Sequence, residues 1–322
     1  MHAFTSTRRS ALAALAAALS SPSWAQSDRA IKFILPNATA SGVDTITRSA
    51  QAALAKALGH PIVVENQPGA GGVVGVSALV RSPPDGFTLG VVSNNVVIYP
   101  SLIKALPFDP IADITPIAIV GATPIVVVIN PKVPAKNAKE LAALMKAKNG
   151  EFNYGSSGNG TNLHLAAEMF VDEAGAKAKH IPYKGVGPML TDLIGGQVEM
   201  ATAALPSVQA HIKSGALRAI GVGAAQRVPA APDIPTMTEQ GMPGYLVEGW
   251  FAVIGPKLMP AAEVKRVHDA VVTAFASPEV VEAMAKQGNS ISVGSTEAAA
   301  RFFRSELEKY AKLVKKAGLE LQ

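Results

Sequence analysis

The chain has 322 residues, a formal net charge of +5 and no cysteine. Its Lys and Arg residues are scattered and its aromatic residues are few, which excludes the basic, aromatic-rich surface of a nucleic-acid-binding protein. No disulfide can form, so buried apolar side chains must hold the core, and a chain of this length has room for two domains.

Residues 1–25 have the pattern of an export signal. Arg8 and Arg9 supply a positive region, Ala11–Leu19 is a short apolar run, and Ser23–Ala25 has small residues where a signal peptidase requires them. The run is too short to span a bilayer, and the arginine pair fits a twin-arginine signal as well as a Sec signal. We expect cleavage after Ala25 and a periplasmic chain, with the export route left open.

Short strands alternate with helices at the start of the exported chain. The expected strands are Ala30–Leu35, Ile62–Glu65 and Phe87–Val92, and the first helix runs from a cap at Asp44 to Leu58. This alternation predicts a doubly wound α/β domain, whose ligands lie beyond the carboxyl ends of strands. Two polar loops, 37–42 and 93–95, occupy such places, although each also fits an ordinary connection.

The alternation returns between Ile125 and Val222, beginning with the apolar strand Ile125–Ile129. We therefore expect two α/β lobes, one made of residues 26–124 and 223–322 and the other of residues 125–222. A strand at Trp250–Ile254 and three C-terminal helices, the last at Thr296–Ala317, would pack on the first lobe. The chain would then cross between lobes near Gly121–Ile125 and near Val222–Gln226, which predicts a hinged clamp with the ligand in the cleft.

The segment Tyr154–His164 carries the clearest signal. It reads as a strand end, a loop with three glycines and the start of a helix at Leu163. Free N–H groups at a helix N-terminus, together with the helix dipole, make an anion site. The alternative is a plain glycine-rich turn with Thr161 or Ser157 as an ordinary N-cap.

A search for catalytic motifs finds none. There is no Walker sequence, the glycine loop lacks the last glycine of a nucleophile elbow, and the histidines share no metal-ligand spacing. His164 fits a structural hydrogen-bonding role better than that of a base, and Lys184 could reach an anion or simply face solvent. We expect no enzymatic activity, no metal and no cofactor.

Several segments together resemble the Bug (TctC-like) extracytoplasmic binding proteins of tripartite tricarboxylate transporters. They span essentially the whole exported chain in order: Val64–Gly72, Pro84–Leu89, Tyr154–Thr161, Pro182–Gly185, Thr191–Val198 and Pro232–Thr236. The resemblance implies a type II periplasmic-binding-protein-like fold, no enzymatic activity and delivery of a small carboxylate to a membrane permease. It also implies that backbone N–H groups and water from the first β–α loop and the glycine loop hold the ligand carboxylate.

Two departures from the family pattern fall in the expected pocket. Ala40 and Ser41 stand where the family has glycines, and Ala203 and Ala204 stand where it often has Asp or Asn. Asp44 keeps its family place. The expected ligand-binding residues are Thr39, Ala40, Ser41, Gly42, Asp44, Ser93, Asn94, Ser156, Ser157, Gly158, Asn159, Gly160, Thr161, Thr202 and Ala203.

The expected function is that of a monomeric periplasmic receptor that passes a small organic carboxylate to the membrane subunits of its transporter. Two alternatives remain open at this stage. A binding protein of the same shape could report its ligand to a membrane signalling partner, or the fold could carry a periplasmic enzyme, for which no catalytic set is found.

Overall fold

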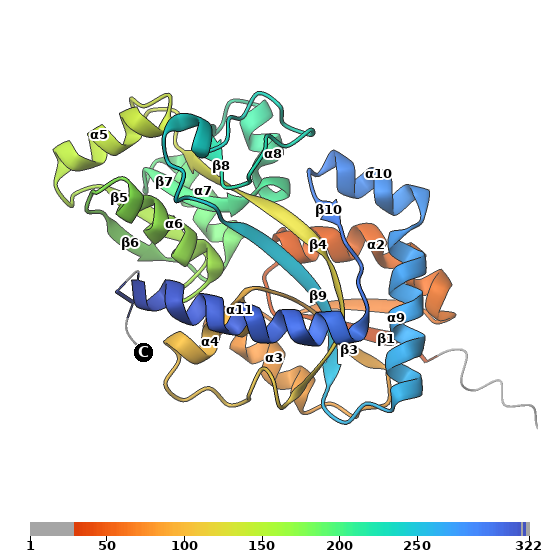
Figure 1. Ribbon diagram of the computed structural model, residues 1–322. Coiled ribbons are helices and arrows are strands. Elements are labelled where there is room, and N and C mark those ends of the chain that lie inside the picture. The colour runs from red at the N-terminus through yellow and green to blue at the C-terminus, as the bar shows by residue number, and fades with distance from the viewer. Residues whose placement is uncertain (1–28, 317, 320–322) are drawn as a thin grey trace, which may run out of the picture.

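The computed structural model describes residues 29–316, 318 and 319. The expected signal peptide and the expected helix end at Ala317 lie outside these residues. The described chain forms one curled, mixed sheet of ten strands with helices packed against it (Figure 1). Within the described residues, no helix is both long and apolar enough to cross a membrane.

The first lobe is built on a parallel trio of strands, β2 (Ile62–Asn66), β1 (Ile31–Leu35) and β3 (Thr88–Ser93), which an antiparallel β9 (Glu248–Pro256) extends. Alternate strand residues face opposite sides, so the sheet buries apolar side chains on both faces. The helices over one face are α2 (Gly42–Leu58), α9 (Ala261–Phe275) and α10 (Pro278–Lys286). Those over the other face are α3 (Val73–Val80), α4 (Asn95–Leu102) and α11 (Thr296–Lys316).

The second lobe has its own apolar core. Its strands are β5 (Asn153–Ser156), β6 (Lys179–Pro182), β7 (Met200–Ala204) and β8 (Arg218–Val222). Its helices are α5 (Ala138–Lys148), α6 (Asn162–Glu173), α7 (Val186–Gly195) and α8 (Leu205–Lys213). Because β5 is parallel to both β6 and β7, the loops after these strands open at the same edge of the sheet.

One long strand, β4 (Ile114–Ile129), belongs to both lobes. Its first part pairs with β9 as far as Pro124, and its second part, from Ile125, pairs with β7 and β8. In Figure 1, β4 and β9 run side by side through the middle of the molecule. The two connections between the lobes are therefore neighbouring antiparallel strands.

The return crossing does not lie near Val222–Gln226, where the sequence placed it. Val228, Met237, Tyr245 and Val247 are buried in the core of the second lobe, so the chain stays with that lobe until β9 begins. The prolines of this segment suggested an irregular return to the first lobe, but burial of these side chains keeps it on the second. A short 3-10 helix, η2 (Thr238–Gln240), lies within it.

Other differences are local. Helix α2 begins at Gly42 with Ser41 as its N-cap, so Asp44 lies in the first turn and is not the cap. Helix α4 was not expected, because it is apolar on all sides and contains Pro100. The short strand β10 (Ser290–Ile291), which pairs with β4, and the 3-10 turn η1 (Ala70–Gly72) also lack a strong sequence pattern.

Candidate functional site

A cleft between the lobes narrows toward the two crossing strands. Its outer part has a volume of about 740 Å³, and an adjoining inner part has a volume of about 40 Å³. Residues of both lobes line both parts, which share Asn37, Ser41, Ser157 and Val186. The inner lining includes Thr123 and Ile125 of β4 and Gly249 and Phe251 of β9. The inner end therefore has room for one small polar group, and the outer part has room for the rest of a ligand.

Four helices begin at the inner end. Gly42 and Val43 open α2, Leu163 is in the first turn of α6, Val186 opens α7, and Ser207 lies in the first turn of α8. One of these helices comes from the first lobe and three come from the second. Their positive dipole ends meet where the cleft is narrowest, which favours a negative charge there.

Some backbone donors at these helix starts have no partner in the protein. Ser41 and Thr161 cap α2 and α6 through the N–H groups of Asp44 and His164. The backbone N–H groups of Gly42, Val43 and Leu163 have no acceptor among the described residues. They are the orphan donors that a bound anion can satisfy.

The cleft lining contains no acidic side chain and one basic side chain, that of Lys184, within the described part of the chain. Lys184 is exposed and belongs to the outer part. Tyr183 beside it donates its hydroxyl to Asp192 at 2.8 Å, and burial together with that carboxylate raises the pKa of Tyr183 to about 12. The inner end therefore offers neutral donors only, and any direct ion pair is confined to the outer part.

The structure places seven of the sequence-predicted residues on the cleft. They are Ser41, Gly42, Ser93, Ser157, Gly158, Asn159 and Thr161. Thr39, Ala40, Gly160 and Ala203 do not line it. Ala40 has a φ of 63°, so this loop keeps a glycine-like backbone at a place where the family has glycine.

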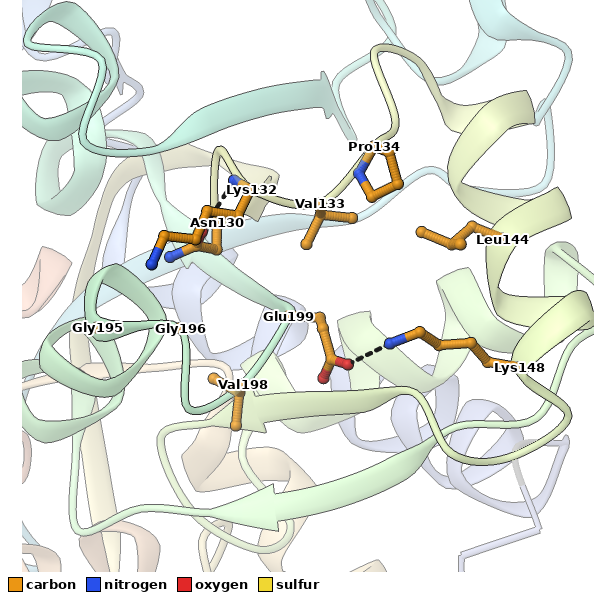
Figure 2. A pocket seen from close by; sticks show the side chains of 10 residues that line it. All are labelled: Asn130, Lys132, Val133, Pro134, Leu144, Lys148, Gly195, Gly196, Val198 and Glu199. Atoms are coloured by element: carbon orange, nitrogen blue, oxygen red, sulfur yellow. Dashed lines mark hydrogen bonds and ion pairs between the residues drawn. The ribbon is translucent and has the colours of Figure 1, made fainter.

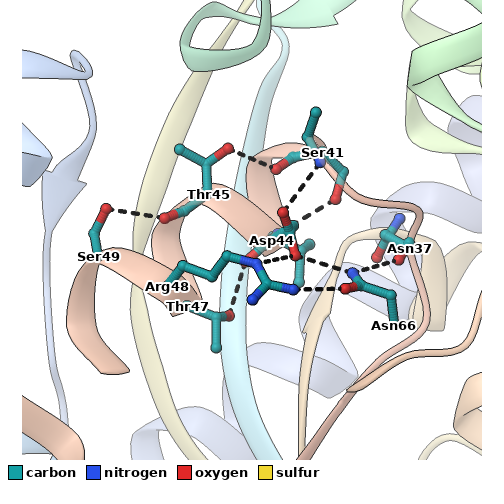
Figure 3. A network of polar contacts seen from close by, with 10 residues as sticks. Asn37, Ser41, Asp44, Thr45, Thr47, Arg48, Ser49 and Asn66 are labelled. Carbon is teal, nitrogen blue, oxygen red and sulfur yellow. Dashed lines mark hydrogen bonds and ion pairs between the residues drawn. The ribbon is translucent and has the colours of Figure 1, made fainter. Parts of the chain in front are cut away.

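Asp44 supports the first loop from behind (Figure 3). Its carboxylate accepts hydrogen bonds from the Ala40 N–H at 3.0 Å, from Arg48 Nε at 2.8 Å and from Asn66 Nδ2 at 3.0 Å. Asn66 Nδ2 also donates to the backbone oxygen of Asn37. Asp44 is buried and does not line the cleft, so its contacts fix the loop's shape.

Three more predicted residues have partners within the protein. Asn94 accepts from the Trp250 N–H at 2.9 Å and donates to the Glu248 oxygen at 3.2 Å, which ties α4 to β9. The Ser156 hydroxyl accepts from the Gly158 N–H, and the Thr202 hydroxyl donates to the Leu163 oxygen at 2.6 Å. All three side chains are buried and hold the loops that carry the lining residues.

Several lining residues were missed by sequence reasoning. Thr123, Gly249 and Phe251 lie on the crossing strands, whose pairing is not visible in the sequence. Pro68–Gly72 lines the outer part. The glycines of this segment were a usable signal, because a glycine run after a strand marks close backbone approach.

A second hollow lies on the far side of the second lobe, where β4, α5 and α7 end (Figure 2). Its volume is about 220 Å³, and most of its polar groups are already paired. Lys148 Nζ lies 2.7 Å from Glu199, and Asn130 Nδ2 donates to the oxygens of Leu193 and Ile194 at the end of α7. These contacts join the ends of neighbouring elements, so they stabilise the second lobe and do not indicate a binding site. No group of three or more metal-ligating side chains occurs among the described residues.

Two α/β lobes joined by paired strands, with helix N-termini facing an interlobe cleft, define a binding protein of the periplasmic type. The model of the Tripartite tricarboxylate transporter family receptor (TctC) matches residues 46–319. The chain therefore belongs to this family of periplasmic solute-binding proteins, which confirms the resemblance drawn from its motifs and the expected fold.

Three similar proteins illustrate the match. Protein BugT of Bordetella pertussis is 34% identical over 296 residues, which cover 91% of each chain. The structure of MatC from Rhodopseudomonas palustris with bound malate has a TM-score of 0.84 at 26% identity and covers 89% of this chain and 99% of its own. A second R. palustris structure, with adipate, has a TM-score of 0.88 at 26% identity and covers 91% of this chain and 99% of its own.

Proposed function

We propose that this protein captures a small organic carboxylate in the interlobe cleft and delivers it to the membrane subunits of a tripartite tricarboxylate transporter. One observation carries the proposal. Four helix N-termini meet at an inner end that, among the described residues, holds no acidic group, and the N–H groups of Gly42, Val43 and Leu163 there have no acceptor within this part of the chain. Charge-assisted hydrogen bonds from such donors are about twice as strong as neutral ones, so they can hold a carboxylate without an arginine.

The two parts of the cleft suggest how the ligand lies. One carboxylate occupies the inner end against the helix starts, and the remainder of the molecule extends into the outer part. Pro36, Pro68 and Ile103 make much of the outer lining apolar, and Lys184 is its one cation among the described residues. Malate and adipate, the molecules bound in the two R. palustris structures, are therefore suitable first probes.

A thermal-unfolding screen tests the binding step. Malate, adipate and other mono- and dicarboxylates are compared with adipamide, which has the shape of adipate without its charge. A carboxylate at about 100 times its Kd should add roughly 2.7 kcal/mol and raise Tm by roughly 4–5 °C for a chain of this length. Stabilisation by adipamide equal to that by adipate would count against anion capture at the helix starts.

Delivery is tested separately, in cells. One strain lacks the gene for the binding protein, and a second strain lacks a gene for a membrane subunit of the transporter. Both deletions should abolish uptake of the radiolabelled carboxylate. Unchanged uptake in the first strain, together with a lost transcriptional response to that carboxylate, would favour the sensing role over transport.

A further inference from the structure

Two histidines lie ring on ring behind the glycine loop of the cleft. His164 of α6 and His180 of β6 have ring centroids 3.8 Å apart and planes inclined by 12°. The Tyr154 ring of β5 stacks beside His180 with centroids 5.1 Å apart. None of the three side chains lines the cleft, so a bound ligand would not touch them.

Both imidazoles contact the glycine loop, which lines the cleft on its other side. His164 Nδ1 accepts a hydrogen bond from the Gly160 N–H at 3.2 Å. His180 Nε2 lies 2.6 Å from Ser156 Oγ, and the same oxygen accepts from the Gly158 N–H at 3.2 Å. The pair therefore anchors the two glycines that have positive φ, Gly158 at 134° and Gly160 at 71°.

The His164 contact requires a neutral ring, and the stacking of the two imidazoles disfavours a charge on His180. An Nδ1 atom that accepts the Gly160 N–H carries no proton, so the hydrogen-bond network assigns the proton of His164 to Nε2, which lies 3.7 Å from Glu168 Oε1. A second proton on His164 would put two N–H groups against each other and remove the acceptor. A proton on His180 would place a cation against the neighbouring imidazole.

Among the residues that the structure describes, two other titratable groups contact the pair: Glu168 of α6 and Tyr154 of β5, whose hydroxyl donates to Glu168. Burial raises the pKa of Glu168, but the adjacent His164 and the hydrogen bond from Tyr154 outweigh it, and the pKa ends below its usual value. Burial and the adjacent His164 lower the pKa of His180 to about 4, against the opposing effect of Glu168. The rings therefore sit beside a carboxylate that stays ionised while His180 stays neutral at neutral pH.

We propose that the stacked His164 and His180 are positioning residues, which hold the glycine loop in its binding shape only while both rings are neutral, so that carboxylate binding weakens in acid. The link to ligand affinity rests on the proposed function, whereas the link to loop shape does not. A merely structural pair would fill space behind the loop without coupling the Gly160 amide to pH.

The first test needs no ligand. Nitrogen-15 NMR of the exported chain should show an unprotonated His164 Nδ1 at pH 7.5, and the Gly160 amide resonance should follow the imidazole resonances as the pH falls to 4. The Gly215 amide, in a turn at the end of α8, is the control and should not follow them. A proton on His164 Nδ1 at pH 7.5, or a Gly160 amide that ignores the imidazoles, overturns the proposal.

The second test measures adipate binding by calorimetry. His164→Leu removes the acceptor and should weaken binding at pH 7.5 by roughly fivefold. His164→Asn places an amide oxygen near the Nδ1 position, and it should recover most of that loss. The double variant His164→Asn/His180→Gln should lose less affinity between pH 7.5 and pH 4 than the native protein.

The controls separate the two proposals. Protonation of adipate itself affects every variant alike, so it cancels in the comparison. Equal loss of affinity with falling pH in the native protein and the double variant would overturn the proposal that protonation of the two histidines weakens binding in acid. If adipate binds neither protein at pH 7.5, the choice of ligand fails, while the loop measurement still decides the role of the pair.

Discussion

The side-chain oxygen of Asn95 accepts the backbone N–H of Asn162 at 2.7 Å. Asn95 opens α4 in the first lobe, and Asn162 opens α6 in the second, so this hydrogen bond joins the lobes across the cleft. A second bridge runs from Ser207 Oγ to the Ala40 oxygen at 2.9 Å. Both hydrogen bonds thus join the lobes through Asn162 and Ser207, two residues that line the inner end.

Removing the first bridge should favour the open clamp. Asn95→Ala leaves the Asn162 N–H without its acceptor, so the closed state loses on the order of 1 kcal/mol and ligand affinity falls roughly fivefold. Small-angle scattering should show a larger radius of gyration for the variant than for the native protein without ligand. Thr191→Ala, which removes an exposed hydroxyl within α7, is the control. Equal radii for native protein and Asn95→Ala would show that this bridge does not hold the lobes.

Gly160 is a further point of contact between the lobes. A Cβ atom there would lie 3.1 Å from Leu102 Cδ1 of α4, and the φ of 71° disfavours any other residue. Gly160→Ala should lower stability by about 1–2 kcal/mol and weaken ligand binding by roughly tenfold, because the methyl group pushes the lobes apart. Gly215 has a similar φ of 76°, and no atom of the described part of the chain beyond its own neighbours lies within 4 Å of an added Cβ, so Gly215→Ala should lower stability alone. Calorimetry measures the ligand affinity of both variants, and chemical unfolding measures their stability. Equal ligand affinities for Gly160→Ala and Gly215→Ala would show that a methyl group at residue 160 does not push the lobes apart.

Ala40 has a left-handed backbone with a φ of 63°. Ala40→Gly removes the strain of a Cβ in that region but adds freedom to the unfolded chain, so we expect a net gain of about 0.5–1 kcal/mol. Ala38→Gly in the same loop lacks the strain and should lose stability by a similar amount. Urea unfolding of the two variants gives the comparison. Destabilisation by Ala40→Gly would show that the left-handed backbone of Ala40 is not strained in this loop.

Stability should also depend on His180. Its pKa falls from the ordinary 6.5 to about 4 on folding, so the unfolded chain binds more protons between these values. This contribution is complete above pH 6.5 and is lost as the pH falls toward 4. Urea unfolding should therefore show a smaller loss of stability between pH 7 and pH 4.5 for His180→Gln than for the native protein. An identical loss in both proteins would mean that His180 has the same pKa in the folded protein as in the unfolded chain.

Much of the site follows from the sequence because loops after strand ends carry readable polar and glycine patterns. Ser41, Ser157 and Thr161 were predicted from such patterns and line the cleft. Asp44 and Asn94 were predicted for the same reason but face inward, since a sequence does not reveal which polar side chain supports a loop and which one lines it.

The missed parts of the fold depend on long-range pairing. Burial of Tyr245 and Val247 in the second core moves the return crossing to β9, and no local pattern records this. Gly249 and Phe251 then reach the cleft through pairing of β9 with β4. Helix α4 escaped detection because it is apolar all round, which leaves no helical periodicity to read.

The most direct test of the central claim follows individual backbone amides during a titration with malate or adipate, whichever stabilises the protein in the screen. Nitrogen-15 NMR should show the amide protons of Gly42, Val43 and Leu163 moving downfield to saturation, because each gains a charged acceptor. Lys184→Ala should change the affinity only slightly, since Lys184 is exposed and lies in the outer part. If these three amides stay unmoved at saturation while Lys184→Ala abolishes binding, capture by helix N-termini is wrong and an ion pair holds the ligand.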